Sequence, residues 1–291
     1  MNKSKDIVKL FLSFIVFYFA SSILVVFIKY GLGIDTSTLS IKNLALIEML
    51  FTFFFAIIYT ILHFDVIKYS FKDLKGKKVT QFISAVVTGL LIVYGAQIFA
   101  SIIENLLSII IGLEQESVVN QQSFEVLLKS APVIAIISAC ILAPIEEELL
   151  FRGAVGKVFK NKKVFIAVSG LIFGLAHVTD SVMFLGEFIL LGIVFDLITE
   201  NPNRKKRIML SVISTVLILF VFGIFYYFEY GNLIIKIQNL DLNEVIGSIS
   251  YIFAGCAIAY NYVLNNRNIL VNMGMHAVIN TIAVLITLCL K

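Results

Sequence analysis

Charged side chains are scarce in this chain of 291 residues: only 14% are Asp, Glu, Lys or Arg, whereas 59% are hydrophobic. An average soluble domain is about 25% charged and about 45–50% apolar. The apolar residues also form long runs, not the stripes of amphipathic helices. The sequence therefore excludes an ordinary soluble domain and predicts an all-α fold, a polytopic transmembrane helix bundle.

Cysteine is also rare, and the net charge is small. Cys140, Cys256 and Cys289 all fall inside apolar runs, and an odd number of embedded thiols argues against a disulfide framework. None of the three has the spacing of a metal site. The net charge of +4 comes from Lys and Arg residues that lie between apolar runs. We therefore predict the lipid bilayer, and no nucleic acid, as a partner.

The apolar residues divide into nine segments, with no internal repeat or low-complexity stretch among them. The first follows a basic start like that of a signal peptide, but a run near 20 residues better fits an uncleaved transmembrane helix. We predict one membrane domain over residues 1–291 with about 8–9 membrane helices. The segments lie at about 8–30, 43–66, 81–112, 131–157, 164–178, 182–199, 208–229, 245–264 and 269–290.

Basic residues gather in alternate loops between these segments, and the remaining loops are poor in cations. Cytoplasmic loops carry an excess of Lys and Arg. The pattern therefore predicts a plasma-membrane protein with a cytoplasmic N-terminus and an external C-terminus. The basic clusters are Lys3 to Lys9, Lys68 to Lys78, Lys157 to Lys163, Arg204 to Arg207, and Arg267.

The stretch "PIEEELLFRG" places four ionisable side chains in the segment 131–157. Each costs about 2.5–3.5 kcal/mol at the centre of a membrane helix, so their presence needs an explanation. Glu148 and Arg152 are four residues apart and can pair on one helix face. Glu147 points about 100° away from Glu148 and is free for other work.

Other polar features of the apolar segments are less specific. Pro144 removes one backbone hydrogen bond, frees the carbonyl of Cys140 and predicts a kink where the acids begin. Glu146 faces in a third direction, toward another helix or the interface. Three further buried acids could shape selectivity or pair locally: Glu48, Glu104 and Glu187.

Histidine occurs only three times. His63 lies near a helix end beside charged residues and is predicted to be interfacial and non-catalytic. His177 and His276 lie in strongly apolar segments, and Asn280 shares a face with His276. At about 1.5 Å per residue from the cytoplasmic ends, Glu147, His276 and His177 lie roughly 15, 12 and 21 Å deep. These depths allow the three to share one site.

The chemistry of such a site fits hydrolysis of an amide bond. A carboxylate and an imidazole can activate a water, and a second imidazole and a carboxamide can stabilise an oxyanion. Glu147, His177 and His276 could instead bind zinc, although there is no H-E-x-x-H motif. Glu and His chains also relay protons in transporters, although we find neither inverted repeats nor paired broken helices.

Three motifs together resemble the CPBP family, which includes CAAX-type prenyl proteases and bacteriocin-processing Abi proteins. The resemblance covers about 130–198 and 245–290, predicted as the protease core, and 199–243 is a probable insertion. Each motif alone is weak, and all three in order on separate helices are specific. They are EExxxR as Glu147, Glu148 and Arg152, FxxxH as Phe173 and His177, and HxxxN as His276 and Asn280.

The resemblance implies an intramembrane glutamic endopeptidase that needs no cofactor and no metal. Glu147 and His177 would activate the water, and His276 and Asn280 would form the oxyanion hole. Three residues would orient Glu147 or pack beside it: Glu148, Arg152 and Phe173. The substrate would be a membrane-associated peptide or protein: a prenylated CAAX protein, a peptide pheromone or a bacteriocin leader. A zinc protease, a proton-coupled transporter and an inactive immunity protein remain alternatives.

Overall fold

The computed structural model describes residues 5–10, 12–14, 17, 24, 27–34, 39–113, 119–177, 209 and 242–289. Within these ranges every regular element is a helix and no strand occurs, which confirms the predicted all-α bundle. Outside the described residues lie the predicted segment 182–199, the predicted segment 208–229 apart from residue 209, nearly all of the predicted insertion 199–243, and Glu187.

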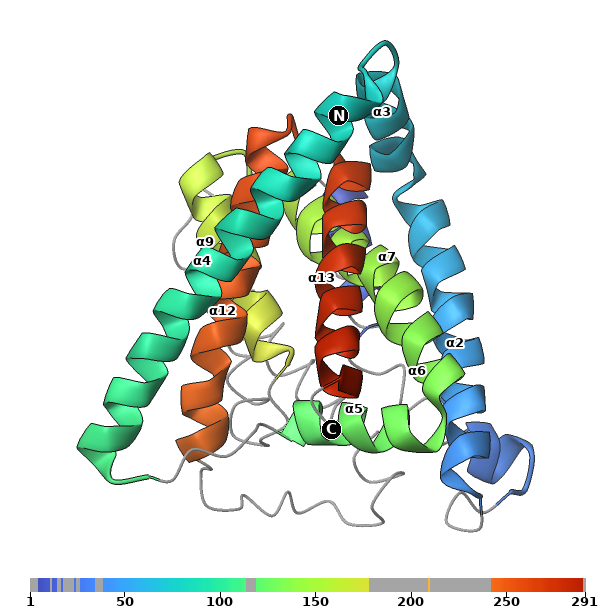
Figure 1. Ribbon diagram of the computed structural model, residues 1–291. Helices are drawn as coiled ribbons and strands as arrows, with labels where there is room; N and C mark the ends of the chain where they lie inside the picture. Colours follow the sequence, from blue (N-terminus) through green and yellow to red (C-terminus); the bar gives the residue numbers. More distant parts are fainter. Residues whose placement is uncertain are drawn as a thin grey trace.

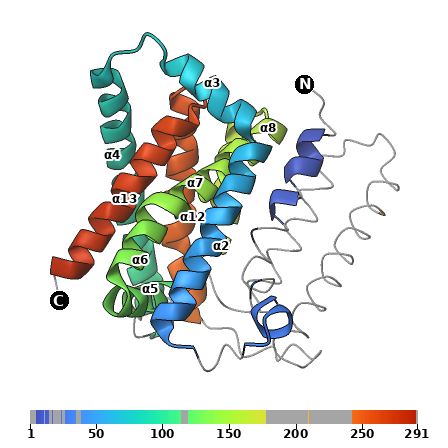
Figure 2. The same ribbon diagram turned by 90° about the vertical axis from the view of Figure 1, so that its right-hand side faces the viewer.

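Four of the described helices are long and apolar enough to cross a membrane, so the chain is a membrane protein, as predicted. They are α2 (Ile41–Leu62), α4 (Val79–Ile111), α12 (Leu242–Leu264) and α13 (Ile269–Cys289). The helix α12 packs against both α4 and α9 (Lys162–Leu175), and α13 also packs against α4. Figures 1 and 2 show how these helices are arranged, and in Figure 1 α2 runs along the outer side of the bundle.

A fifth long helix runs from residue 132 to residue 158 and carries the acidic cluster; we call it the acidic helix. It is continuous but alternates between α-helical and wider π-helical turns. Its parts are α6 (Pro132–Ile137), η3 (Ser138–Leu142), α7 (Ala143–Glu147), η4 (Glu148–Ala154) and α8 (Val155–Val158). π-Helical turns are rare and frequently occur at functional sites.

The π-helical stretch η3 ends at Leu142, two residues before Pro144, where the sequence predicted a kink. A π-helical carbonyl accepts from the N–H five residues later, and Pro144 has no N–H to offer Ala139. Asn280 of α13 instead donates to the Ala139 carbonyl at 2.7 Å. The sequence predicted that Pro144 frees the carbonyl of Cys140. Because the local turn is wider, the carbonyl that accepts from a side chain is instead that of Ala139.

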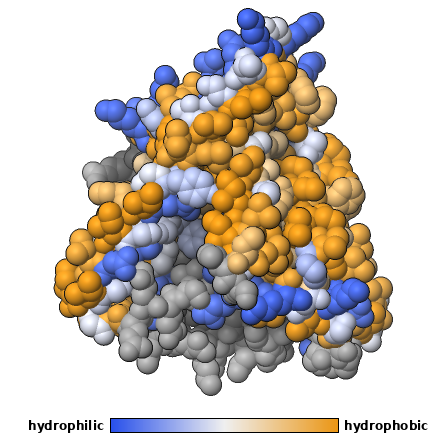
Figure 3. All heavy atoms as spheres, in the orientation of Figure 1, coloured by the Kyte–Doolittle hydropathy of each residue, from blue (hydrophilic) through white to orange (hydrophobic). Residues whose placement is uncertain are grey.

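The described basic loops meet at one end of the bundle, which we call the basic end: residues 75–78, 159–163 and 265–268. Asn268 donates to Asp73 at 2.8 Å, and Lys157 pairs with Asp65 at 2.5 Å. Burial raises the pKa of Asp65, but the hydrogen bond and charge of Lys157 lower it more. Hydrophilic side chains crowd this end in Figure 3, at its top. We call the opposite end of the bundle the far end.

Two predicted loops contain helices that periodicity within apolar runs did not reveal. The predicted segment 43–66 ends early, because α2 stops at Leu62 and α3 (Phe64–Leu74) follows after His63. Asp65 in its first turn and Lys72 in its last complement the helix dipole. At the far end, α5 (Val119–Ser130) occupies most of the region 113–127, which was predicted to be a loop.

Close approach of α9 and α12 depends on glycines in the stretch "GLIFG". A Cβ atom on Gly174 would lie 2.6 Å from the backbone nitrogen of Ile252, and one on Gly170 would lie 2.6 Å from that of Cys256. Small residues four positions apart allow two helix backbones to approach closely in this way. This contact fixes the end of α9 that leads to His177.

We predict that Gly174→Ala lowers stability, because the new methyl group meets backbone atoms that cannot move independently. Overpacking of this kind costs about 1–3 kcal/mol. Gly95→Ala in α4 is the matched control, since a Cβ there meets nothing within 4 Å. Thermal unfolding of both purified variants provides the measurement. Equal melting temperatures for the two variants would contradict the close approach.

Candidate active site

The carboxylate of Glu148 is the best-paired acid in the described part of the protein. Its side chain is completely buried, with 0% exposure. Oε1 lies 3.1 Å from Arg152 Nη1 and 2.9 Å from His276 Nδ1. Oε2 accepts from the Asn272 amide at 3.2 Å. Glu148 therefore joins the acidic helix to α13 through His276 and Asn272, and it pairs with Arg152 within its own helix.

Glu147 differs sharply from its neighbour. Its Oε2 is buried and has no hydrogen-bond partner among the described residues. It lies 3.9 Å from His177 Nε2 and 3.8 Å from His276 Nε2. Both separations exceed the length of a hydrogen bond, about 2.7–3.2 Å. The structure thus brings the three residues from different helices together and leaves one carboxylate oxygen between two imidazoles.

The hydrogen bonds of the two rings indicate their tautomers. His177 Nδ1 lies 2.7 Å from the carbonyl oxygen of Phe173, which can only accept, so Nδ1 carries the proton. His276 Nδ1 lies 2.9 Å from the Glu148 carboxylate and donates to it in the same way. In a neutral ring this leaves Nε2 as an acceptor, and both Nε2 atoms are the ones nearest Glu147.

The Phe173 ring and the Arg152 guanidinium pack close to the side chains of this candidate active site. Phe173 is 3% exposed, and its ring centroid lies 4.5 Å from that of His177. The Arg152 guanidinium lies 4.4 Å from the Phe173 centroid, within the range of a cation–π contact. Arg152 Nη2 also donates to the Gly255 carbonyl of α12 at 3.1 Å. Arg152 therefore links the acidic helix to both α9 and α12.

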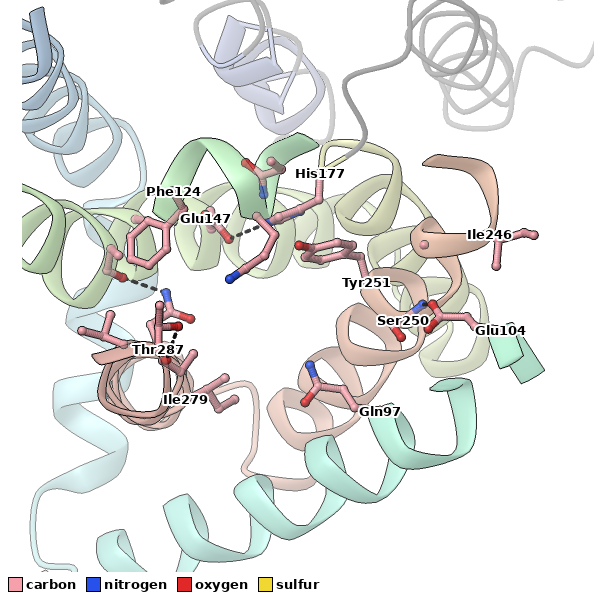
Figure 4. Close-up of a pocket in the computed structure, with 18 of the residues that line it drawn as sticks. Gln97, Glu104, Phe124, Glu147, His177, Ile246, Ser250, Tyr251, Ile279 and Thr287 are labelled. Atoms are coloured by element: carbon pink, nitrogen blue, oxygen red, sulfur yellow. Dashed lines mark hydrogen bonds and ion pairs between the residues drawn. The ribbon is translucent and has the colours of Figure 1, made fainter. Parts of the chain in front are cut away.

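Glu147 and His177 face a cavity of about 520 Å³. The cavity extends from these two residues into the far half of the bundle, between the diverging helices α4 and α13, with α5 and α12 completing its wall. Figure 3 shows a hollow between α4 and α13, and Figure 4 shows Glu147, His177 and Tyr251 at the cavity surface. Asn280 also lines it.

Several residues near this site were not predicted from the sequence. Asn272 supports Glu148, and it lies four residues before His276 just as Asn280 lies four after it. A polar residue every fourth position in an apolar helix was a usable signal for it. Tyr251 stacks on His177 with centroids 4.7 Å apart, and no local pattern distinguishes it from other tyrosines in apolar helices.

The remaining acidic and imidazole groups lie elsewhere. Glu146 is half-buried and does not line the described cavity wall. His63 lies where α2 meets α3, far from the cavity, and is fully buried against Ser13 at 2.9 Å. The sequence predicted an interfacial position for His63, whereas its side chain is enclosed by protein. Among the described residues, no group of three or more His, Cys, Asp or Glu has an arrangement able to hold a metal ion.

Several helices of the membrane bundle converge at this site. They bring together a carboxylate, two imidazoles and a carboxamide, which are groups able to carry out acid–base chemistry. A family model described as "Type II CAAX prenyl endopeptidase Rce1-like" matches residues 129–237. The match confirms the resemblance to the CPBP and CAAX protease family, a family of intramembrane endopeptidases. It spans the first two motifs and most of the predicted insertion, and it ends before His276 and Asn280. No curated protein and no solved structure matches the chain.

We predict that Arg152→Ala destabilises the protein, because it leaves the Glu148 carboxylate buried without its cationic partner. Breaking a buried ion pair typically costs about 3–5 kcal/mol. The double variant Arg152→Ala with Glu148→Gln should recover part of this loss, because it also removes the uncompensated charge. Thermal unfolding of the three proteins checks this. A double variant less stable than Arg152→Ala would show that charge compensation is not the reason.

Proposed function

We propose that this protein is an intramembrane glutamic endopeptidase in which Glu147 and His177 activate a water that hydrolyses a peptide bond. One observation carries the proposal. The Glu147 carboxylate has an unpartnered oxygen 3.9 Å from an imidazole nitrogen, at the surface of a cavity of about 520 Å³. The sequence match to a family of endopeptidases supports the same reaction class.

In the proposed mechanism a water lies between the two groups. If it bonds both Glu147 Oε2 and His177 Nε2 at about 2.8 Å, it spans their 3.9 Å separation and faces the cavity. As the water oxygen attacks the carbonyl carbon, its proton passes to Glu147. When the C–N bond breaks, the same proton can pass from Glu147 to the leaving amine. No covalent enzyme intermediate is needed.

The developing oxyanion needs donors, and His276 and Asn280 can supply them. Asn280 uses one N–H for the Ala139 carbonyl at 2.7 Å, and its second N–H remains for the substrate. His276 donates Nδ1–H to Glu148, so its Nε2 can donate only in the doubly protonated ring. The carboxylates of Glu147 and Glu148 flank that ring and would compensate its positive charge.

Glu148 and Arg152 act as positioning residues in this proposal. Glu148 uses both oxygens on fixed partners, so it cannot take the role of the base. Its bond to His276 orients the imidazole toward Glu147. Phe173 has a similar task, because its carbonyl accepts the Nδ1–H of His177 and directs Nε2 to the water. Changes at these residues should therefore act through ring orientation.

Two other functions use the same residues. A zinc protease would need Glu147, His177 and His276 as ligands, and it differs from our proposal in having zinc bound in the active enzyme. A proton-coupled transporter would need the Glu147 and His177 pair as a relay. The match to an endopeptidase family favours hydrolysis over transport. The proposed substrate is a membrane-associated peptide or protein: a prenylated CAAX protein, a peptide pheromone or a bacteriocin leader.

We propose a plasma-membrane location with the basic end in the cytoplasm, which also places the N-terminus there. Lys9 of the N-terminal helix donates to the Leu62 carbonyl at the start of the basic end. Cytoplasmic loops are the ones enriched in Lys and Arg. The cavity then lies in the outer half of the membrane. External labelling, in intact cells, of a single cysteine placed within 157–163 would overturn this orientation.

We predict that Glu147→Gln abolishes cleavage and leaves the fold intact, because glutamine keeps the shape of the side chain and cannot accept the proton of the water. Glu146→Gln is the matched control and should retain activity, since Glu146 does not line the described cavity wall. Asn280→Ala removes one oxyanion donor and should lower kcat by about 10²–10³.

The assay uses purified enzyme reconstituted in lipid, a peptide substrate and a parallel thermal-unfolding measurement. An active Glu147→Gln enzyme together with an inactive Glu146→Gln enzyme would shift the assignment by one residue. Cleavage that is unchanged in every variant would remove the protease proposal itself.

A further inference from the structure

We infer that Glu104 is a substrate-recognition residue, and that the cavity binds a peptide carrying a positively charged Lys or Arg side chain close to the cleaved bond. This inference rests on the proposed function, because it places the charged side chain next to the Glu147 and His177 site. It is carried by the position, partners and surroundings of Glu104 in α4.

Glu104 is an acid in a strongly apolar helix, in the stretch "ASIIENLLSIII". Its side chain is buried, with 7% exposure, and it lines the cavity. A carboxylate in this position is costly and marks a functional group more often than a packing residue. The neighbouring wall positions in α4 are Gln97 and Ser108, so the polar stripe of this helix faces inward.

The partners of Glu104 leave its charge uncompensated in the described part of the protein. Oε1 accepts the backbone N–H of Ser250 at 2.8 Å, which is a neutral donor. None of the ion pairs among the described residues includes Glu104. The buried pair of Glu148 and Arg152 shows the opposite arrangement in the same bundle. A cationic substrate group would provide Glu104 with a positive counter-charge, as Arg152 does for Glu148.

The wall around Glu104 has the character of a site for a polar, cationic group. Among the described residues that line the cavity there is no Lys and no Arg, whereas Glu104 and Glu147 both contribute a carboxylate. Two acids facing one cavity inside a membrane attract positive charge. A purely apolar lipid tail at this wall would leave the Glu104 carboxylate without a counter-charge, which is unfavourable. Other polar wall residues include Gln97, Ser108, Asn120, Gln121 and Ser250.

A chain of direct contacts connects Glu104 to the water-activating residues. Glu104 bonds Ser250, and the next residue, Tyr251, stacks on His177 with centroids 4.7 Å apart. His177 Nε2 then lies 3.9 Å from Glu147. Figure 4 shows Tyr251 between His177 and the Ser250–Glu104 pair. An extended peptide advances about 3.3 Å per residue, so the charged side chain belongs to a residue a few positions from the cleaved bond.

The test uses a randomised synthetic peptide library and enzyme reconstituted in lipid nanodiscs. In one arm, wild-type enzyme cleaves the library and mass spectrometry identifies the new termini. In the other arm, immobilised Glu147→Gln enzyme captures peptides without cleaving them. We expect Lys or Arg at one position near the cleaved bond, and about tenfold or greater enrichment of such peptides on capture.

Glu104→Gln should remove this preference, so that cleavage of basic peptides falls about tenfold or more relative to cleavage of neutral peptides. Its amide oxygen can still accept from Ser250, so the packing of α12 is kept. Glu104→Lys should favour Asp or Glu at the same position. The matched control is Glu48→Gln, an exposed acid of the membrane helix α2 that does not line the described cavity wall. It should keep the preference for basic peptides.

Two results would overturn the inference. One is wild-type cleavage or capture with no preference for Lys or Arg. The other is an equal loss of activity on basic and neutral peptides in Glu104→Gln, which would indicate that Glu104 only positions Ser250 and Tyr251. A folded enzyme that captures basic peptides through Glu104 but cleaves none of them would support the recognition site and contradict the proposed protease function. The two failures are therefore distinguishable.

Discussion

The buried carboxylate of Glu148 is the interaction on which the rest of the site depends. It holds Arg152, His276 and Asn272 at 2.9–3.2 Å from its oxygens, with no exposure to solvent. A single charge without partners is unstable inside a membrane bundle, so this network allows only a narrow range of helix positions. Through Arg152 and its bond to Gly255, it also fixes α12 against the acidic helix.

In the proposed mechanism the adjacent glutamates divide two tasks that one residue cannot perform together. A structural acid needs all its lone pairs occupied, and a general base needs one free. Glu148 has its oxygens occupied, whereas Glu147 has Oε2 unpartnered among the described residues. The π-helical turns of the acidic helix and Pro144 also shape the site. The Ala139 carbonyl that they free accepts a hydrogen bond from Asn280 beside the cavity.

Sequence reasoning could reach the parts of this arrangement that depend on strong local signals. Ionisable residues in apolar segments identified Glu147, His177 and His276, and a depth estimate from helix rise showed that they could meet. The spacing of Glu148 and Arg152 predicted their ion pair, which the structure confirms at 3.1 Å. The assignment of catalytic roles to these residues stays a prediction.

Other features depended on tertiary contacts and were not predictable from local patterns. The helix α5 has too few apolar residues to stand out, and it forms where residues 119–130 close the far end of the cavity. Tyr251 and the cavity wall near Glu104 arise only when α4 and α12 pack together, so the specificity that we infer was invisible in either helix alone.

The central claim is that Glu147, and not a metal ion, holds and activates the attacking water. A crystal structure of the enzyme in a lipid phase, with diffraction data on both sides of the zinc absorption edge, tests it most directly. We expect an ordered water within hydrogen-bond distance of Glu147 Oε2 and His177 Nε2, with no anomalous signal, in crystals of enzyme that is active before crystallisation. A stoichiometric zinc peak bound by Glu147, His177 and His276 would contradict the account.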